Sequence, residues 1–402
     1  MKRKLHPNII WLAIASLFND ISGEIITRAL PLFLAGTLGI STTIIGVIEG
    51  VADATSSLLK IVSGKLSDRY KTRKAPTLIG YSLTAVARPL LLLTTTWVIP
   101  FVSRFFDRAG KGIRTAPRDA LVADSVVAGD RNRAFGIQRT FDPLGAVIGA
   151  LIAAFAAKVF AEGASNTISA HTFTILIYIA AIPSFISVIL IAIFVKNILA
   201  DVPVKSDGNV LQRFKFRSTF KKYLAVLFVF SLGMSSDAFL LLRSSQAGLT
   251  PPEIFLLVAF FNLVTTLSAY PAGMLADRFG KKQIIVFGWL FYAAVYVGFA
   301  ITDSPFIISI LFIAYGLYYG LTEGTEKALV ADLVPTERRG AAYGWFNAII
   351  GISALPASIG FGYLWQKFGP QAAFGFGAGC AMLAAILLIL FLDGKKLAIS
   401  EE

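Results

Sequence analysis

The residues best suited to chemistry in this sequence are ionisable side chains inside long apolar stretches. In "NDISGEIITRAL", Asp20, Glu24 and Arg28 recur at intervals of four, which places them on one face of a helix. In "VIEGVAD", Glu49 and Asp53 have the same spacing. Because removal from water favours the protonated carboxyl, Asp20, Glu24 and Asp53 are candidate proton carriers. The alternative for Glu24 is a permanent ion pair with Arg28 that only holds helices together.

A second charged series lies in "SRFFDRAGKGIRTAPRD", where ionisable residues follow one another at helical spacing. They form one stripe along a helix: Arg104, Asp107, Arg108, Lys111, Arg114 and Arg118. Such a stripe cannot face lipid, because a charge costs about 2.5–3.5 kcal/mol at the centre of a bilayer on insertion scales. Guanidinium and ammonium groups bind carboxylate and phosphate oxygens. We therefore expect Arg104, Arg108 and Lys111, together with Arg28, to contact a substrate. Arg114 and Arg118, nearer the predicted membrane surface, are interpreted as interfacial anchors.

The elements that carry these residues are membrane-spanning helices. Of the 402 residues, 56% are hydrophobic and only 15% are charged, so the chain has more apolar surface than a soluble core can bury. The apolar runs predict an all-α membrane protein of twelve spans: 8–36, 43–63, 75–95, 97–121, 134–158, 171–196, 222–246, 253–273, 283–302, 305–333, 339–366 and 370–393. The long polar stretch at 197–221 separates two predicted domains, 1–196 and 222–402.

The distribution of basic residues predicts the orientation of these spans. The net charge is +13, but Lys and Arg are concentrated in alternate gaps between the spans, and the gaps at 37–42, 247–252 and 303–304 contain none. This is the positive-inside pattern, with both termini in the cytoplasm of a multi-pass protein, and we expect it in a bacterial inner membrane. The charge is thereby explained without a nucleic-acid partner.

The sequence shows no motif for ATP hydrolysis or for zinc-dependent catalysis. It has no phosphate-binding loop and no H-E-x-x-H motif, and it contains only two histidines and the single Cys380. We therefore expect no enzyme activity, no cofactor and no metal site. Lipid, protons and a small solute are the expected partners of a monomer.

Two sequence echoes indicate an internal duplication. The pentapeptide ALVAD occurs at 120–124 and at 328–332, an offset of 208 residues, and each copy closes a predicted span. The loop "GKLSDRYKTRK" from Gly64 is echoed by "GMLADRFGKKQ" from Gly273. A duplicated six-helix unit accounts for both echoes and predicts two pseudo-symmetric six-helix bundles.

The second echo resembles a signature of the major facilitator superfamily, G-x-L-a-D-R-x-G-[RK]-[RK]. The resemblance implies a transporter with alternating access and assigns gating roles to Asp68 and Arg69 in the first copy and to Asp277 and Arg278 in the second. A further stretch, with Pro143, Gly145 and Gly149, resembles the superfamily's antiporter signature, although Asp142 replaces its first glycine. Asp142 is also one helical turn from Arg139, a spacing that allows an ion pair.

The duplication also gives a substrate prediction. The offset of 208 maps the cationic stripe onto aromatic positions that include Phe312, Tyr315 and Tyr319. Cations on one side and aromatic rings on the other predict an anionic or zwitterionic organic solute with an apolar or aromatic part, moved with protons. Three alternatives stay open: neutralised charges in a site for multidrug or hydrophobic-compound efflux, a lipid flippase-like transporter, and a membrane sensor or scaffold without transport.

Overall fold

The computed structural model describes residues 6–69, 72–127, 130–162, 166–198, 216, 218–335 and 338–392, without the side chains of residues 65, 68, 69, 131 and 132. Much of the predicted linker at 197–221 therefore lies outside the described residues. The described chain is almost entirely helical. Its first half contains α1 (Pro7–Gly36), α2 (Thr42–Arg69), α3 (Lys74–Ala87) with the short 3-10 helix η1 (Pro89–Leu93), α4 (Val98–Asp124), α5 (Arg131–Val159) and α6 (Ala170–Phe194).

The second half contains α7 (Ser218–Gly233), α8 (Ala238–Gln246), α9 (Pro251–Phe279), α10 (Lys281–Ile301), α11 (Pro305–Leu333), α12 (Arg339–Phe368) and α13 (Pro370–Phe391). Since α7 and α8 together make one span, as do α3 and η1, the predicted twelve spans are confirmed. The span predicted at 222–246 is interrupted at 234–237. There the Ser236 hydroxyl accepts a hydrogen bond from the Ala238 amide at 3.3 Å, a local bond that competes with the helical pattern.

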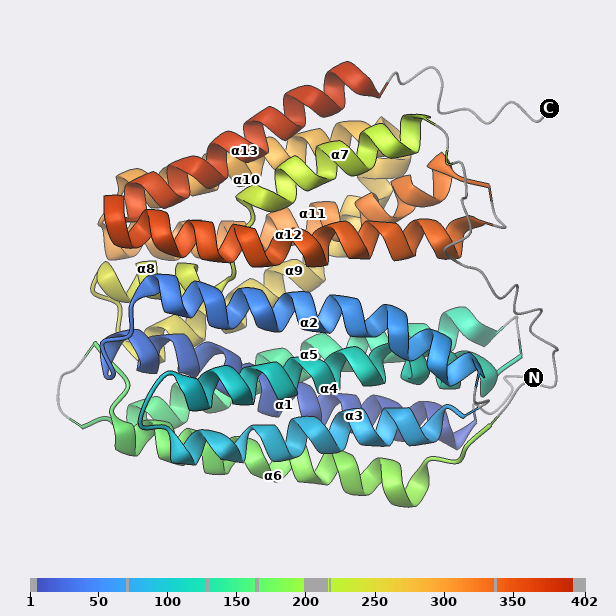
Figure 1. The fold of residues 1–402 in the computed structure, drawn as a ribbon, viewed down its shortest axis with the longest axis horizontal. Helices are drawn as coiled ribbons and strands as arrows, with labels where there is room; N and C mark the ends of the chain where they lie inside the picture. Colours follow the sequence, from blue (N-terminus) through green and yellow to red (C-terminus); the bar gives the residue numbers. More distant parts are fainter. Residues whose placement is uncertain are drawn as a thin grey trace.

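The helices form two bundles that lie side by side, α1–α6 in one and α7–α13 in the other (Figure 1). We call the side where α1 begins and α13 ends the terminal side, and the opposite side the distal side. The bundles meet mainly through α2 against α12 and α5 against α9. Glycine permits the closest approach, because a Cβ on Gly46 would collide with the Ser358 carbonyl oxygen and one on Gly362 with that of Thr42.

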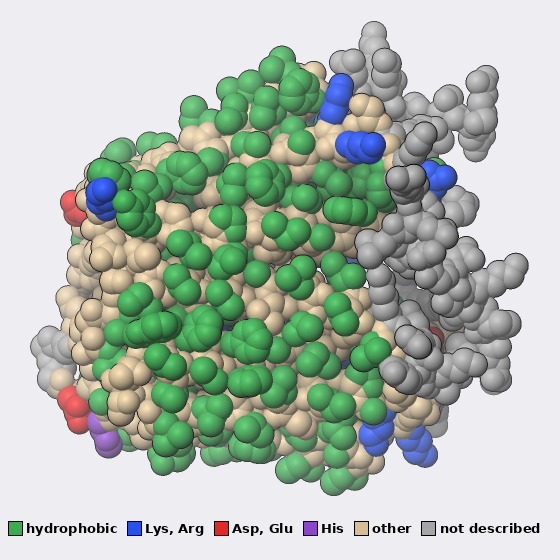
Figure 2. Space-filling model, viewed as in Figure 1, with side chains coloured by type: hydrophobic (Ala, Val, Ile, Leu, Met, Phe, Trp, Pro, Cys, Tyr) green, Lys and Arg blue, Asp and Glu red, His purple; other side chains and the backbone are tan. Residues whose placement is uncertain are grey.

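On the face that Figure 2 shows, the surface between the helix ends is largely apolar, and the charged side chains lie toward the ends of the helices. Among the described residues, ten helical segments are long and apolar enough to cross a membrane. The two remaining spans, α2 and α4, carry many of the ionisable residues. These two helices pack against each other inside the first bundle, so their charges are turned away from the lipid-facing surface.

Candidate functional site

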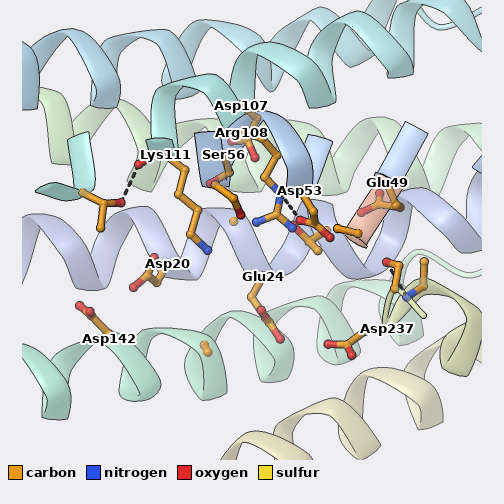
Figure 3. Close-up of a pocket in the computed structure, with 18 of the residues that line it drawn as sticks. Asp20, Glu24, Glu49, Asp53, Ser56, Asp107, Arg108, Lys111, Asp142 and Asp237 are labelled. Atoms are coloured by element: carbon orange, nitrogen blue, oxygen red, sulfur yellow. Dashed lines mark hydrogen bonds and ion pairs between the residues drawn. The ribbon is translucent and has the colours of Figure 1, made fainter. Parts of the chain in front are cut away.

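A central cavity of about 730 Å³ lies between the two bundles and collects most of the charges found within the spans. Its described lining contains eight carboxylates and seven cations: Asp20, Glu24, Glu49, Asp53, Asp107, Asp142, Asp237 and Glu323, with Arg28, Lys60, Arg88, Arg108, Lys111, Arg114 and Arg118. Figure 3 shows side chains of both signs pointing into it. The three residues predicted as proton carriers, Asp20, Glu24 and Asp53, all line this cavity.

Arg28 connects the two bundles at the distal part of the cavity. Its Nε donates to Glu24 Oε1 at 3.0 Å on the same helix, and its Nη1 donates to Asp237 Oδ2 at 3.0 Å in the other bundle. Asn262 of α9 donates a third hydrogen bond, at 2.9 Å, to Glu24 Oε1. The interruption between α7 and α8 places Asp237 at this point. The Glu24–Arg28 pair considered from sequence is therefore present, and it belongs to a bridge between the bundles.

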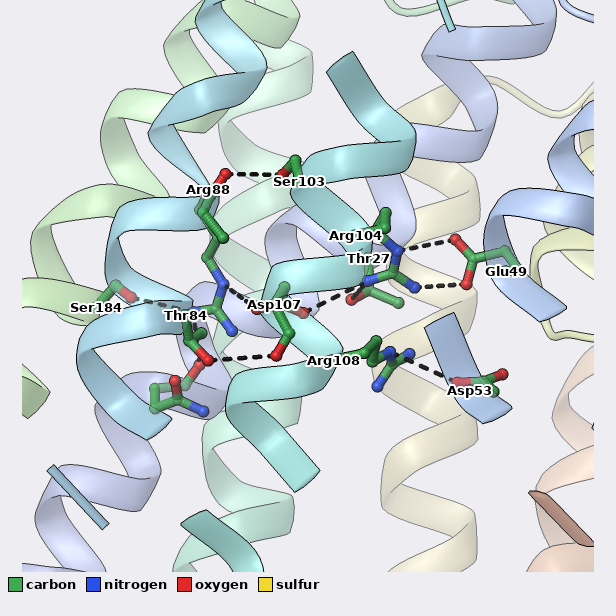
Figure 4. A network of polar contacts seen from close by, with 12 residues as sticks. Thr27, Glu49, Asp53, Thr84, Arg88, Ser103, Arg104, Asp107, Arg108 and Ser184 are labelled. Carbon is green, nitrogen blue, oxygen red and sulfur yellow. Dashed lines mark hydrogen bonds and ion pairs between the residues drawn. The ribbon is translucent and has the colours of Figure 1, made fainter. Parts of the chain in front are cut away.

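Arg104 does not line the cavity, although the sequence favoured it as a substrate contact. Its guanidinium is held by both oxygens of Glu49, at 2.9 and 2.5 Å, and by the Thr27 hydroxyl at 3.1 Å (Figure 4). Only 1% of Arg104 is exposed. Because the N–H donors of this guanidinium already bind a carboxylate inside the bundle, few of them remain to bind a solute. The physical role of Arg104 is to join α4 to α1 and α2.

The rest of the α4 stripe faces the cavity, as its spacing predicted. Asp107 accepts a hydrogen bond from Arg88 at 3.1 Å, and Arg108 lies 3.5 Å from Asp53 in an ion pair (Figure 4). Lys111 is exposed to the cavity. Of the four cations predicted to contact substrate, Arg28, Arg108 and Lys111 are thus accessible to a solute, and the first two are already paired with carboxylates.

The interpretation of Arg114 and Arg118 as interfacial anchors is wrong. Arg114 is buried, donates to the Thr84 hydroxyl at 2.8 Å and lies over the Tyr81 ring. Arg118 lines the cavity, where it donates to the Ser16 hydroxyl at 2.7 Å and lies 3.6 Å from Asp142. Both arginines find hydrogen-bond partners inside the bundle, which an anchor at the lipid interface would lack.

Asp142 therefore has Arg118 as its ion-pair partner, whereas Arg139, which the sequence suggested, is exposed. The glycines that follow Asp142 on α5 have a packing role. A Cβ on Gly145 would lie 2.7 Å from the Leu17 carbonyl oxygen, so α5 and α1 approach closely along this stretch.

The predicted aromatic wall is only partly present. Phe312 and Tyr315 are buried and pack against Phe261 of α9, so neither lines the cavity, while Tyr319 does. The offset of 208 relates positions in sequence but does not preserve which face of α11 turns toward the cavity. The second bundle instead lines the cavity mainly with hydroxyl and amide side chains: Ser231, Ser235, Ser236, Asn262, Thr265, Thr266 and Ser358.

The residues predicted to gate access lie at the terminal side. Asp277 and Arg278 are exposed in the last turn of α9, and the Arg278 guanidinium lies 5.2 Å from the centre of the Phe279 ring. The side chains of Asp68 and Arg69 lie outside the described residues. Their predicted gating roles stay predictions.

Several lining residues were not predicted as site residues. Arg88 is an isolated arginine in the apolar stretch "TAVARPLLLL", so the rule that singled out Asp20 also applied to it. Lys60 lies late in α2, where it looked like an ordinary charge at a span's end. Asp237 and Asn262 belong to the second bundle, and no local spacing connects them with Glu24 or Arg28.

Two six-helix bundles around a charged cavity, with an apolar lateral surface, define a membrane transporter rather than an enzyme. The family model of the Major Facilitator Superfamily matches residues 12–243 and 223–401. The chain belongs to this superfamily, and it is an integral, multi-pass membrane protein.

Individual relatives agree with this assignment. The chain is 31% identical to the MFS-type transporter MJ1317 of Methanocaldococcus jannaschii in an alignment 399 residues long that covers 96% of this chain and 95% of the relative. Over 150 residues, 37% of this chain and 38% of the relative, it is 29% identical to the quinolone resistance protein NorA of Staphylococcus aureus. Its fold is similar to the crystal structure of the nucleoside transporter NupG, with a TM-score of 0.78 and 16% identity over 95% of this chain and 98% of that one.

Proposed function

We propose that the protein is a secondary active transporter that moves a small anionic or zwitterionic organic solute by alternating access, coupled to protons. The observation that carries this proposal is the charged cavity between the bundles, into which Asp20, Glu24 and Asp53 all project. Such carboxylates can bind and release a proton as the surrounding solvent changes. The volume of the cavity also falls in the range of small-molecule sites, about 300–1,000 Å³.

The contacts between the bundles support a rocking motion of residues 1–196 against residues 222–402. Among the described residues, the hydrogen bonds that join the bundles lie at mid-membrane or in the distal half. On the distal side, Thr42 donates to the Gly362 carbonyl at 2.9 Å and Thr43 to Gln366 at 2.5 Å. Opening the distal side would require these few bonds and the Arg28–Asp237 bridge to break, while each bundle keeps its own core.

We place the terminal side in the cytoplasm and the protein in a bacterial inner membrane, as a monomer. The support is the distribution of Lys and Arg described above. On this orientation, Asp277 and Arg278 lie at the cytoplasmic ends of the helices, where a gating contact would form when that side closes.

Efflux of hydrophobic compounds is the second candidate, favoured by the partial similarity to NorA. The lining argues against it, because the only large apolar or aromatic side chains among its described residues are Met234, Ile350 and Tyr319. A hydrophobic drug would leave many of the surrounding polar groups without partners, which costs free energy.

Proton flux in proteoliposomes tests the proposal. Purified protein is reconstituted with a pH-sensitive dye inside the vesicles, and a panel of organic anions, zwitterions and hydrophobic drugs is added outside. The control is Thr43→Cys with Gln366→Cys in a Cys380→Ala background, oxidised so that the distal side cannot open. We expect an anion or zwitterion to drive a proton flux that the crosslink abolishes. Flux with hydrophobic drugs alone would favour efflux, and lipid translocation without solute flux would favour a flippase.

A further inference from the structure

Two lysines on the wall formed by α2 and α4 are unpaired. Lys60 and Lys111 both line the cavity, and neither ammonium group forms an ion pair or a hydrogen bond within the part of the chain that the structure describes. Lys111 points into the cavity in Figure 3. By contrast, Arg28, Arg88 and Arg104 each contact a carboxylate within 3.1 Å. The two lysines therefore differ from the arginines that hold the bundle together.

No carboxylate among the described residues contacts either lysine, although eight carboxylates line the cavity with them. The strongest charge acting on each is the repulsion of Arg108, and Lys111 is also repelled by Lys60. The carboxylates that attract Lys60 are only partly available, since Asp53 already pairs with Arg108 at 3.5 Å and Asp119 with Arg118 at 3.1 Å. Asp20 and Glu323 both act on Lys111, but neither contacts it, and Glu323 already pairs with Lys327 at 2.8 Å. A cation at membrane depth without a carboxylate in contact is costly, so an anion between the two lysines would stabilise this arrangement.

The opposite wall offers hydrogen-bonding side chains beside its carboxylates Asp237 and Glu323. Asn262, Thr265 and Thr266 line it at successive positions of α9. Ser231 of α7 also lines it, is 3% exposed, and its hydroxyl has no hydrogen-bond partner among the described residues. A buried hydroxyl without a partner at the wall of a cavity is a free position for a polar group of a ligand.

We infer that the cavity binds a hydroxylated organic anion, with its carboxylate or phosphate group between Lys60 and Lys111 and its hydroxyl groups against Ser231, Asn262 and Thr265. This assignment rests on the proposed transport function and narrows its substrate class. It replaces the apolar or aromatic part of the solute predicted from the sequence, because two of the three aromatic residues behind that prediction do not reach the cavity. The cavity then recognises the solute's charge with the first bundle and its hydroxyl groups with the second.

Binding to detergent-purified protein tests the inference without requiring transport. The probes are gluconate, galacturonate and glucose 6-phosphate, compared with glucose, which lacks the anion, and hexanoate, which lacks the hydroxyl groups. Isothermal titration measures the affinity, and thermal unfolding with each probe confirms that it binds the folded state. We expect at least one hydroxylated anion to bind tenfold or more tightly than both comparison compounds. The same affinity for glucose or for hexanoate, or no preference for any of the three anions, would overturn the inference.

Variants locate the anion. Lys111→Gln and Lys60→Gln should each weaken binding of the preferred anion by about tenfold to a hundredfold, the effect expected for losing a charge-assisted hydrogen bond. The matched control is Lys158→Gln, which removes an exposed lysine near the distal end of α5, outside the cavity lining. Unchanged affinity in both cavity variants, with folding verified, would exclude the lysine site. If an anion or zwitterion without hydroxyl groups drives proton flux in proteoliposomes while no hydroxylated anion binds, the inference fails and the proposed function stands.

Discussion

Breaking the bridge between Arg28 and Asp237 should shift the protein toward the state in which the distal side is open. The ion pair is 3.0 Å long, and its side chains are 10% and 25% exposed, so solvent screens it only partly. Arg28 keeps Glu24 as a partner after the change, so Asp237→Ala removes one charge-assisted hydrogen bond between the bundles, and a longer one from Tyr315 at 3.4 Å, but strands no buried charge. Such a bond contributes about 1.5–3 kcal/mol. If the bond exists only in the described state, its loss changes the equilibrium between states by roughly tenfold to a hundredfold.

A smaller effect is expected for Asp237→Asn, because the amide oxygen still accepts from Arg28 and a neutral hydrogen bond is about half as strong as a charged one. The assay is labelling of Ala238→Cys, a cavity position, in a Cys380→Ala background. An impermeant maleimide is added from the distal side, and faster labelling reports distal opening.

The matched control is Asp303→Ala, which removes a carboxylate bound to Arg243 at 2.6 Å within one bundle. It should leave the labelling rate unchanged. Equal labelling in Asp237→Ala and the parent protein would show that the bridge persists in both states or contributes nothing. An equal increase in the Asp303→Ala control would point to general loosening instead.

Two further predictions concern charges inside the first bundle. Arg104→Ala should destabilise the protein by about 3–5 kcal/mol, because it leaves Glu49 buried without its cation; thermal unfolding measures the loss, and a Tm equal to that of the parent would refute it. At least one of Asp20→Asn, Glu24→Gln and Asp53→Asn should abolish solute accumulation driven by a proton gradient. The same variant should still exchange solute across the membrane, since exchange moves no net proton. Full uphill transport in all three variants would show that other residues couple transport to protons.

The elements of the fold could be predicted from the sequence because they follow from local properties. Apolar runs of sufficient length gave the twelve spans, and the repeated ALVAD pentapeptide gave the pairing of the two halves. Helical spacing also gave the inward face of α4, since Asp107, Arg108 and Lys111 do line the cavity. Each of these predictions depends on residues close together in the chain.

Which charged residues hold the bundle together and which face the cavity could not be predicted, because this depends on contacts between distant helices. Arg104 and Arg108 are four residues apart on one stripe, yet Glu49 of α2 neutralises the first inside the bundle and the second reaches the cavity. In the same way, Tyr315 and Tyr319 are one turn apart and both pack against Phe261 of α9, yet Tyr315 is buried and only Tyr319 of the two lines the cavity. A modest rotation of a helix about its axis decides whether a side chain faces the cavity or a neighbouring helix. The spacing of residues along one helix does not specify that rotation.

The central claim is that the two bundles move as bodies around the cavity, and paired distance measurements test it most directly. Spin labels at Thr43→Cys and Gln366→Cys report the distal side, and a second variant labelled at Ala120→Cys and Ala328→Cys reports the terminal ends of α4 and α11; both lack Cys380. Double electron–electron resonance then compares each pair with and without Asp237→Ala. The account predicts that this substitution lengthens the distal distance and shortens the terminal distance together. A change in one distance without the other, or no change in either while the protein still transports, would contradict it.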